Sequence, residues 1–286
     1  MMSEHTVRRV TRTLILFGVL VIIWRVVTGL GRLGIGAPGG ASGGSMTLGL
    51  ALGLMGLLFV LCGLAAWFRM RTAAAALFAF YGVFYGLHWG GVIYAEDAWF
   101  DNAFRLLHLV LSGILSQAFL FHFALLYTQA KAILDRRLSI YILYAPAAVV
   151  VLVMLVTILL QGNATVLAEL EGWLQLSETI FTNVYFLFAA LAIWAGWWRT
   201  DRESRRETGI SLAAGGLLVS ISPYLASIIG NAAAPAPWIY QFGAAPYTLF
   251  FSFIPITFLI AMLRNHGTVA KNVARRGMPA AGVSNR

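Results

Sequence analysis

The chain has 286 residues, of which 60% are hydrophobic and 11% are charged, and its formal net charge is +9. Soluble domains carry about a quarter charged residues, so this composition excludes an ordinary soluble enzyme or binding domain. The excess of Lys and Arg does not indicate nucleic-acid binding, because it lies in short clusters between apolar runs, as in membrane proteins. The single cysteine, Cys62, excludes an internal disulfide and a cysteine-based metal cluster.

Apolar runs of about 20 residues, the length that crosses a bilayer, recur along the chain. They predict an all-α fold: a polytopic integral membrane bundle of eight transmembrane helices. The predicted helices are 12–30, 46–67, 72–94, 104–129, 139–161, 174–198, 208–230 and 245–263. The first run lacks a small-residue cleavage site, so we interpret it as a retained helix rather than as a signal peptide.

A glycine-rich segment separates the first predicted helix from the other seven. The sequence "GRLGIGAPGGASGGS" is typical of a flexible linker, so we expect a 1 + 7 arrangement in which the first helix stands apart. The predicted parts are a first helix with its N-terminal segment at 1–30, an extracytoplasmic linker at 31–45, a seven-helix block at 46–264 and a disordered basic tail at 265–286.

Basic residues lie in alternate connections between the predicted helices. These connections and the two termini hold Arg8, Arg9, Arg12, Arg69, Arg71, Lys131, Arg136, Arg137, Arg199, Arg202, Arg205, Arg206, Arg264, Lys271, Arg275, Arg276 and Arg286. The opposite connections hold Glu96, Asp97, Asp101, Glu169, Glu171, Arg32 and Arg105. Because Lys and Arg favour cytoplasmic loops, this pattern predicts a multi-pass protein of the bacterial inner membrane with both termini in the cytoplasm.

Glycine and proline positions indicate how the helices pack and bend. "GVFYGLHWG" and "GLALG" place glycines four residues apart, and small residues at this spacing let membrane helices approach closely. Pro146, Pro223 and Pro255 lie inside the fifth, seventh and eighth predicted helices. Since proline lacks an N–H, we expect each one to free a carbonyl and to kink its helix.

Three segments over residues 104–264 resemble a known family. They are "LSQAFLFHFALLYTQ", "TDRESRRETGISLAAGGLLVSISPYLASI" and "LFFSFIPITFLIAMLR". In this order they are similar to the seven-helix membrane sensor region of bacterial histidine kinases of the competence-pheromone-receptor type. The resemblance implies a sensory helical block that takes part in signal transduction. The final "RNHGTVAKNVARRGMPAAGVSNR" has neither a phosphoacceptor site nor ATP-binding boxes, so we expect no kinase and no enzyme activity.

Polar residues within the predicted membrane segments are the candidates for a site, because burying them in hydrocarbon is costly. Stripes on four predicted helices include Tyr81, Tyr85, His88, Arg105, His108, Ser112, Ser116, Gln175, Glu178, Thr182, Tyr185, Ser222, Tyr224 and Ser227. At about 1.5 Å per residue, His88, His108 and Glu178 lie roughly 6–9 Å below the outer surface. We therefore expect an outward-facing polar pocket lined by Tyr81, Tyr85, His88, Arg105, His108, Ser112, Glu178, Thr182 and Tyr224.

Other interpretations of these polar stripes stay open. The groups can simply satisfy one another as interhelical hydrogen bonds, each worth about 1 kcal/mol. A metal or haem would need facing histidines, for which only His88 and His108 lie at matched depth. His122 lies far below His108 and is expected against neighbouring helices or headgroups. No cofactor is predicted.

Three functional hypotheses follow from the sequence. In the first, the chain is a non-catalytic sensor whose pocket binds a small amphiphile, a peptide or a quinone-like ring and which signals through a separate protein. In the second, it is an accessory or structural subunit of a larger bacterial membrane complex. In the third, it is a membrane enzyme or a haem- or quinone-binding redox protein that uses His88, His108 and Glu178. All three require membrane lipid, the first two also require a protein partner, and none involves nucleic acid.

Overall fold

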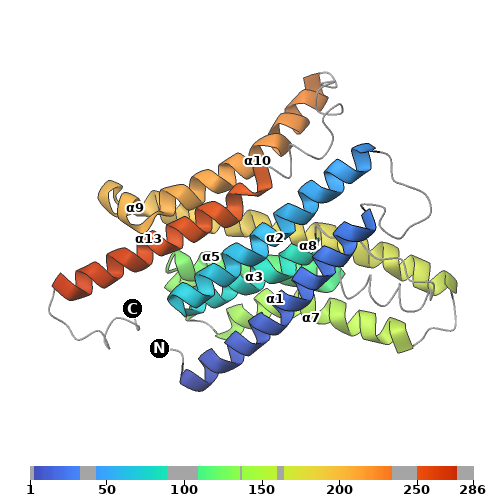
Figure 1. Cartoon of the computed structure of the whole chain (residues 1–286), viewed down its shortest axis with the longest axis horizontal. Coiled ribbons are helices and arrows are strands. Elements are labelled where there is room, and N and C mark those ends of the chain that lie inside the picture. Colours follow the sequence, from blue (N-terminus) through green and yellow to red (C-terminus); the bar gives the residue numbers. More distant parts are fainter. Residues whose placement is uncertain are drawn as a thin grey trace.

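The computed structural model of the chain describes residues 3–32, 43–88, 109–135, 137–159, 164–233 and 250–275. Helices make up nearly all of these residues, and no strand occurs among them. The predicted all-α fold is therefore confirmed. The long helices lie roughly along one axis, with short helices at one end of the bundle (Figure 1).

The helices follow the predicted apolar runs closely. The long ones are α1 (Glu4–Arg32), α2 (Gly43–Met70), α3 (Ala73–His88), α5 (Ser116–Tyr127), α7 (Arg137–Leu159), α8 (Ala164–Arg199), α10 (Ile210–Ala233) and α13 (Phe253–Arg275). A π-helix, η1 (Leu109–Leu115), leads directly into α5, and α6 (Lys131–Leu134) and α9 (Arg202–Thr208) are short helices within connections. Each of the eight predicted runs thus contains one long helix.

The structure differs from the predicted boundaries at three helices. Helix α1 begins at Glu4, before the predicted start at residue 12. Helix α8 begins at Ala164, well before the predicted start at residue 174. Helix α13 continues to Arg275, so residues 265–275 of the tail are helical and the prediction of a disordered tail is wrong for this part. No proline interrupts the segment before Pro279, so nothing in it stops the helix. The rest of the predicted tail, from residue 276, lies outside the described residues.

Pro255 lies near the start of α13 and not inside a continuous eighth helix, so the expected freed carbonyl within that helix is not found. Phe250 and Phe251 are helical, a turn follows at Ser252, and α13 begins at Phe253. Pro255 therefore lies in the first turn of the new helix, where its missing N–H would have no intrahelical partner in any case. Pro146 lies inside the continuous helix α7.

Helix α1 packs directly on α2 and α3, contrary to the expected separation of the first helix from the other seven. Leu14 and Val21 are fully buried in the main hydrophobic core. The indole Nε1 of Trp67 in α2 donates to Thr11 Oγ1 of α1 over 3.1 Å. Burial of apolar side chains against α2 fixes this helix, whatever the length of the linker between them.

Helices α2 and α3 pack closely against each other, and glycines make this possible. A Cβ on Gly82 would overlap the carbonyl oxygen of Phe59, and one on Gly86 would lie 2.7 Å from Cγ2 of Val60. A Cβ on Gly63 would lie 3.0 Å from Cα of Ala79. These contacts confirm the predicted role of the glycines in "GVFYGLHWG". Gly53 of "GLALG", in contrast, has open space around it.

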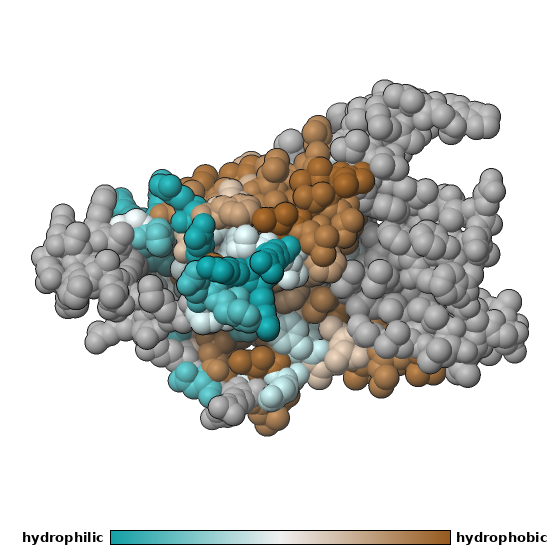
Figure 2. All heavy atoms as spheres, turned by 60° about the horizontal axis from the view of Figure 1, so that its bottom comes forward, coloured by the Kyte–Doolittle hydropathy of each residue, from teal (hydrophilic) through white to brown (hydrophobic). Residues whose placement is uncertain are grey.

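Apolar side chains cover much of the outside of the bundle as well as its core. Figure 2 shows hydrophobic residues over a broad band, with hydrophilic ones gathered towards one end. The exposed apolar residues of α1, α7 and α8 include Ile15, Leu16, Leu20, Leu138, Ile142, Leu152, Leu176, Leu187 and Leu191. Among the described helices, Gly53–Met70 and Ile180–Arg199 are long and apolar enough to cross a membrane, and four shorter apolar segments accompany them.

Basic residues lie at one end of the bundle, which we call the basic end. Four elements reach this end: the start of α1, the end of α2, the connection with α9 and the C-terminal part of α13 (Figure 1). This end holds Arg8, Arg9, Arg12, Arg69, Arg71, Arg199, Arg202, Arg205, Arg206 and Arg264. The opposite end of the bundle is called the far end below.

The connection between α8 and α10 is an ordered structure at the basic end. The Asp201 side chain caps α9 by accepting from the backbone N–H of Ser204 over 2.9 Å. The guanidinium of Arg205 donates to the Thr200 carbonyl over 2.6 Å and lies 4.4 Å above the Trp197 ring. Gly209 ends α9 with a φ of 71°, and a Cβ there would lie 2.7 Å from Cα of Ala261 in α13. The connection is thereby fixed to α13.

Candidate functional site

Polar side chains are buried in the middle of the bundle, where α5 lies between α3 and α8. Ser112, Ser116 and Gln117 are all essentially inaccessible to solvent. Ser112 belongs to the π-helix η1, and Ser116 Oγ donates back to the Ser112 carbonyl and to the Gly113 carbonyl, the latter over 3.0 Å. The π-helix therefore carries its polar residues inwards at the point where it joins α5.

Three buried polar atoms in this region have no hydrogen-bond partner within the described part of the chain. They are Tyr81 Oη in α3, Gln117 Oε1 in α5 and Thr182 Oγ1 in α8. A buried polar atom that loses its partner costs about 1–3 kcal/mol, so native structures seldom leave one unsatisfied. Three of them on adjacent helices mark this region as the candidate site.

All three residues face the centre of the bundle. Tyr81 shares a helix face with Phe78 and Tyr85, which belong to the main core. Gln117 shares a face with Leu120 and Ala124 of the same core. On α8, Thr182 precedes Ala189 and Ile193 by seven and eleven residues, so it lies on their inward-facing stripe.

Ring contacts place the three residues at nearly the same level of the bundle. Phe121 of α5 packs on Tyr185 of α8 with ring centroids 6.4 Å apart. Both helices run towards the basic end, and Gln117 and Thr182 each lie about one turn before these rings. On α3, Phe80 packs on Phe119 at 5.4 Å, and Tyr81 is the next residue towards the far end.

Aromatic rings close the site on the side of α2 and α3. Tyr81 and Tyr85 stack with centroids 5.2 Å apart, and Phe59 of α2 meets both rings edge-on, at 5.6 and 4.9 Å. Edge-to-face rings contribute about 0.5–1.5 kcal/mol each beyond the area they bury. We call Tyr81, Tyr85, Ser112, Ser116, Gln117 and Thr182 the central polar layer.

Four of the predicted lining residues belong to the central polar layer: Tyr81, Tyr85 and Ser112 are buried, and the hydroxyl oxygen of Thr182 is buried. That these residues line one pocket stays a prediction. The side chains of His88, Glu178 and Tyr224 lie outside the described residues, although their backbones belong to α3, α8 and α10. Arg105 and His108 lie outside the described residues altogether.

Gln117 is the site residue that the sequence reasoning missed. It stands inside the quoted segment "LSQAFLFHFALLYTQ", but α-helical spacing from Ser112 selects Ser116 instead. The π-helix η1 ends at Leu115, and its wider turn shifts the residues of α5, among them Gln117, from the positions that α-helical spacing predicts. An amide in an otherwise apolar run was the available signal.

His122 is not part of the central polar layer. Its Nδ1 and the Tyr144 hydroxyl of α7 share a hydrogen bond of 2.9 Å, and its ring lies edge-on to that of Tyr144. The expectation that His122 contacts a neighbouring helix is therefore confirmed. Within the described part of the chain, no three His, Cys, Asp or Glu residues come together as metal ligands.

Comparisons with known proteins found no matching family model, no matching curated protein and no matching solved structure. The resemblance to sensor regions of histidine kinases therefore stays a prediction. The candidate site rests on the geometry of the central polar layer and on its unsatisfied polar atoms.

Proposed function

We propose that the chain is a non-catalytic sensor of the bacterial inner membrane, with eight transmembrane helices and both termini in the cytoplasm. Its central polar layer binds the polar part of a ligand that enters from the outer side, and a separate protein partner receives the signal. The observation that carries this proposal is the set of three unpartnered, buried polar atoms of Tyr81, Gln117 and Thr182.

Membrane placement is supported by the outer surface of the bundle. Many of the described apolar side chains of α1, α7 and α8 are exposed, which would be unfavourable for a monomer in water. The basic end fits the cytoplasmic side, because cytoplasmic ends of membrane helices carry the excess of Arg and Lys. The far end would then face the outside.

A ligand would satisfy groups that the protein leaves unsatisfied. The hydroxyls of Tyr81 and Thr182 can donate or accept, and Gln117 Oε1 can only accept. A hydroxyl, amide or protonated carboxyl group offers the donors and acceptors that these atoms lack. In an apolar interior each such hydrogen bond is stronger than in water, so binding and specificity would both come from this layer.

The same helices connect the layer to the basic end. Tyr127 at the end of α5 donates its hydroxyl to the Thr208 carbonyl of α9 over 2.8 Å. At this end, Gly209 lies against Ala261 of α13. A shift of α5 on ligand binding would therefore change the position of α9 and α13, which present arginines to a cytoplasmic partner.

A second candidate function is that of an accessory subunit in a larger membrane complex. It is favoured by α7, which buries only Leu143, Ala147 and Val150 among its described side chains. The remaining described face of α7 is apolar and largely exposed, as expected of a surface that another membrane subunit covers.

The experiment that tests the proposal is gentle purification of the tagged chain from its native membrane with mass spectrometry of all co-purifying proteins. A sensor is expected to come alone or with substoichiometric amounts of a signalling protein. A stoichiometric set of other membrane subunits would contradict the sensor and support the accessory subunit. Recovery of the chain in the soluble fraction would contradict both.

A further inference from the structure

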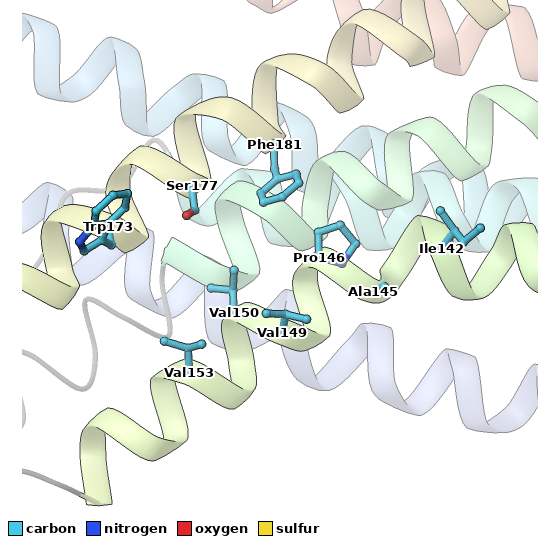
Figure 3. A pocket seen from close by; sticks show the side chains of 9 residues that line it. All are labelled: Ile142, Ala145, Pro146, Val149, Val150, Val153, Trp173, Ser177 and Phe181. Carbon is cyan, nitrogen blue, oxygen red and sulfur yellow. The ribbon is translucent and has the colours of Figure 1, made fainter.

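A groove of about 570 Å³ lies between α7 and α8, and no residue of the central polar layer lines it. Its walls are formed by Ile142, Ala145, Pro146, Val149, Val150, Val153, Trp173, Ser177 and Phe181. Figure 3 shows these side chains on two facing helices, with Val153 and Trp173 towards one end and Ile142 at the other. The volume is within the range of small-molecule sites, about 300–1,000 Å³.

The lining is almost entirely apolar, and its few polar features lie at the ends. Ser177 and the Trp173 indole lie in the part of α8 nearer the far end. At the other end Pro146 has no N–H to donate to the carbonyl of Ile142, the residue four positions earlier. The groove therefore suits a molecule with a long apolar body and a hydrogen-bonding head.

The shape of the groove argues against a transmembrane helix as the occupant. A helix with side chains is about 10–12 Å wide, and helices approach closely in membranes where small residues line the contact. Only Ala145 and Ser177 are small here, the valines and Pro146 are of medium size, and Ile142, Trp173 and Phe181 are large. Near Phe181, the Tyr185 hydroxyl donates to the Leu143 carbonyl over 2.5 Å and holds α7 against α8. The space is therefore suited to one hydrocarbon chain.

We propose that the groove between α7 and α8 binds a single-chain amphiphile from the membrane, with its hydrocarbon chain along Val149 and Phe181 and its polar head at Ser177 and Trp173. This inference rests on the proposed membrane placement. It assigns the molecule a second site, because the outward-facing wall of α8 lines the groove while Thr182 on its inner side belongs to the central polar layer.

Occupancy of the groove is coupled to the central polar layer through α8. Phe181 lines the groove, and the next residue, Thr182, carries an unpartnered hydroxyl in the layer. Tyr185, one turn further on, packs on Phe121 of α5 and bonds to Leu143 of α7. A chain that parts α7 from α8 would strain the Tyr185–Leu143 hydrogen bond and move α8 relative to α5.

The test uses the full chain in lipid nanodiscs and a palmitic acid analogue with a photoreactive diazirine in mid-chain. We expect saturable labelling confined to peptides of α7 and α8, reduced about tenfold by excess palmitic acid, as for a competed site. The variant Val149→Trp fills the groove and is expected to lose most of this labelling. The control Leu152→Trp places the same bulk on an exposed residue of α7 outside the lining and is expected to label like the wild type.

Three results would overturn the proposal. Labelling spread over α1 and α7 alike, without competition, would show that the fatty acid acts only as bulk lipid. Equal labelling of the Val149→Trp and Leu152→Trp variants would place the bound chain elsewhere. A chain that stays out of nanodiscs would overturn the membrane placement as well, whereas uniform labelling of an inserted chain would overturn the groove alone.

Discussion

The α2–α3 pair and the α7–α8 pair show two ways in which apolar helices meet in one bundle. At α2–α3, Gly82 and Gly86 let the backbones approach until no room is left for a Cβ. At α7–α8, Pro146, Val149 and Phe181 hold the helices apart around a groove of about 570 Å³. Residue size at the contact accounts for the difference, because small residues let helices approach closely and larger ones keep them apart. The first pair serves as a rigid frame, and the second has room for an occupant.

The largest effect is expected when the tight pair is disturbed. Gly82→Ala puts a Cβ onto the Phe59 carbonyl, and we expect a loss of about 3 kcal/mol of stability, at the upper end of ordinary overpacking. The matched control is Gly53→Ala in open space, which is expected to be neutral or to stabilise by up to about 1 kcal/mol. Thermal unfolding in detergent measures both. Equal effects of the two variants would contradict the close approach.

A smaller effect is expected at the loose pair. Tyr185→Phe removes the hydroxyl that donates to the Leu143 carbonyl, at an expected cost of about 1 kcal/mol. Tyr141→Phe, on the same pair but 72% exposed, is the control and is expected to be neutral. Thermal unfolding with and without palmitic acid measures the difference. If the two variants unfold alike, Tyr185 does not hold α7 against α8.

A substitution on the inner side of α8 is expected to increase stability, whereas Gly82→Ala and Tyr185→Phe decrease it. Thr182→Val replaces an unpartnered buried hydroxyl by a methyl group of similar shape. In the purified chain without ligand we expect a gain of about 1 kcal/mol, because the cost of burying the hydroxyl disappears. A loss of stability without any ligand would show that a protein group already satisfies this hydroxyl. Chemical denaturation of the reconstituted chain decides the sign.

The smallest effect is expected in the connection after α8, outside both helix pairs. Hydrogen bonds from Ser204 lower the pKa of the Asp201 carboxyl below its usual value. The bond from the Ser204 backbone N–H has the larger effect, and the bond from its side chain has the smaller one. Because the pKa is lower in the folded state, the capping contribution is present above the unfolded pKa and is lost as pH falls through the folded one.

Hydrogen exchange of the α9 amides measures this contribution. We expect faster exchange in the wild type as the pH falls below the usual aspartate range, after correction for the intrinsic pH dependence. Asp201→Asn keeps a capping oxygen without a titrating group, so its corrected exchange is expected to stay constant. A wild type that behaves like Asp201→Asn would show that the cap does not depend on charge.

The sequence predicted those features that depend on local chemistry. Long apolar runs located the eight long helices, and the spacing of Gly82 and Gly86 predicted a close helix contact. Four residues expected on polar stripes, among them Tyr81 and Thr182, are buried or carry a buried hydroxyl, while the pocket itself stays a prediction. In each case a single side-chain property, apolarity or size, determines the structure.

Features that depend on tertiary contacts or on helix geometry could not be predicted in this way. The linker composition suggested a separate first helix, but burial of Leu14 and Val21 fixes α1 to the bundle. Gln117 was missed because η1 has π-helical rather than α-helical spacing. The groove at Pro146 depends on which residues of α8 face α7, and the sequence of α7 alone does not contain this information.

The most direct test of the central claim is native mass spectrometry of the chain extracted in its own lipids, comparing wild type with Gln117→Leu. Ser222→Ala, a change at an exposed serine of α10, serves as the control. The account predicts one small molecule bound to the wild type and to the control, and its loss from Gln117→Leu. Identical bound masses in all three, or none in any, would contradict a ligand site in the central polar layer.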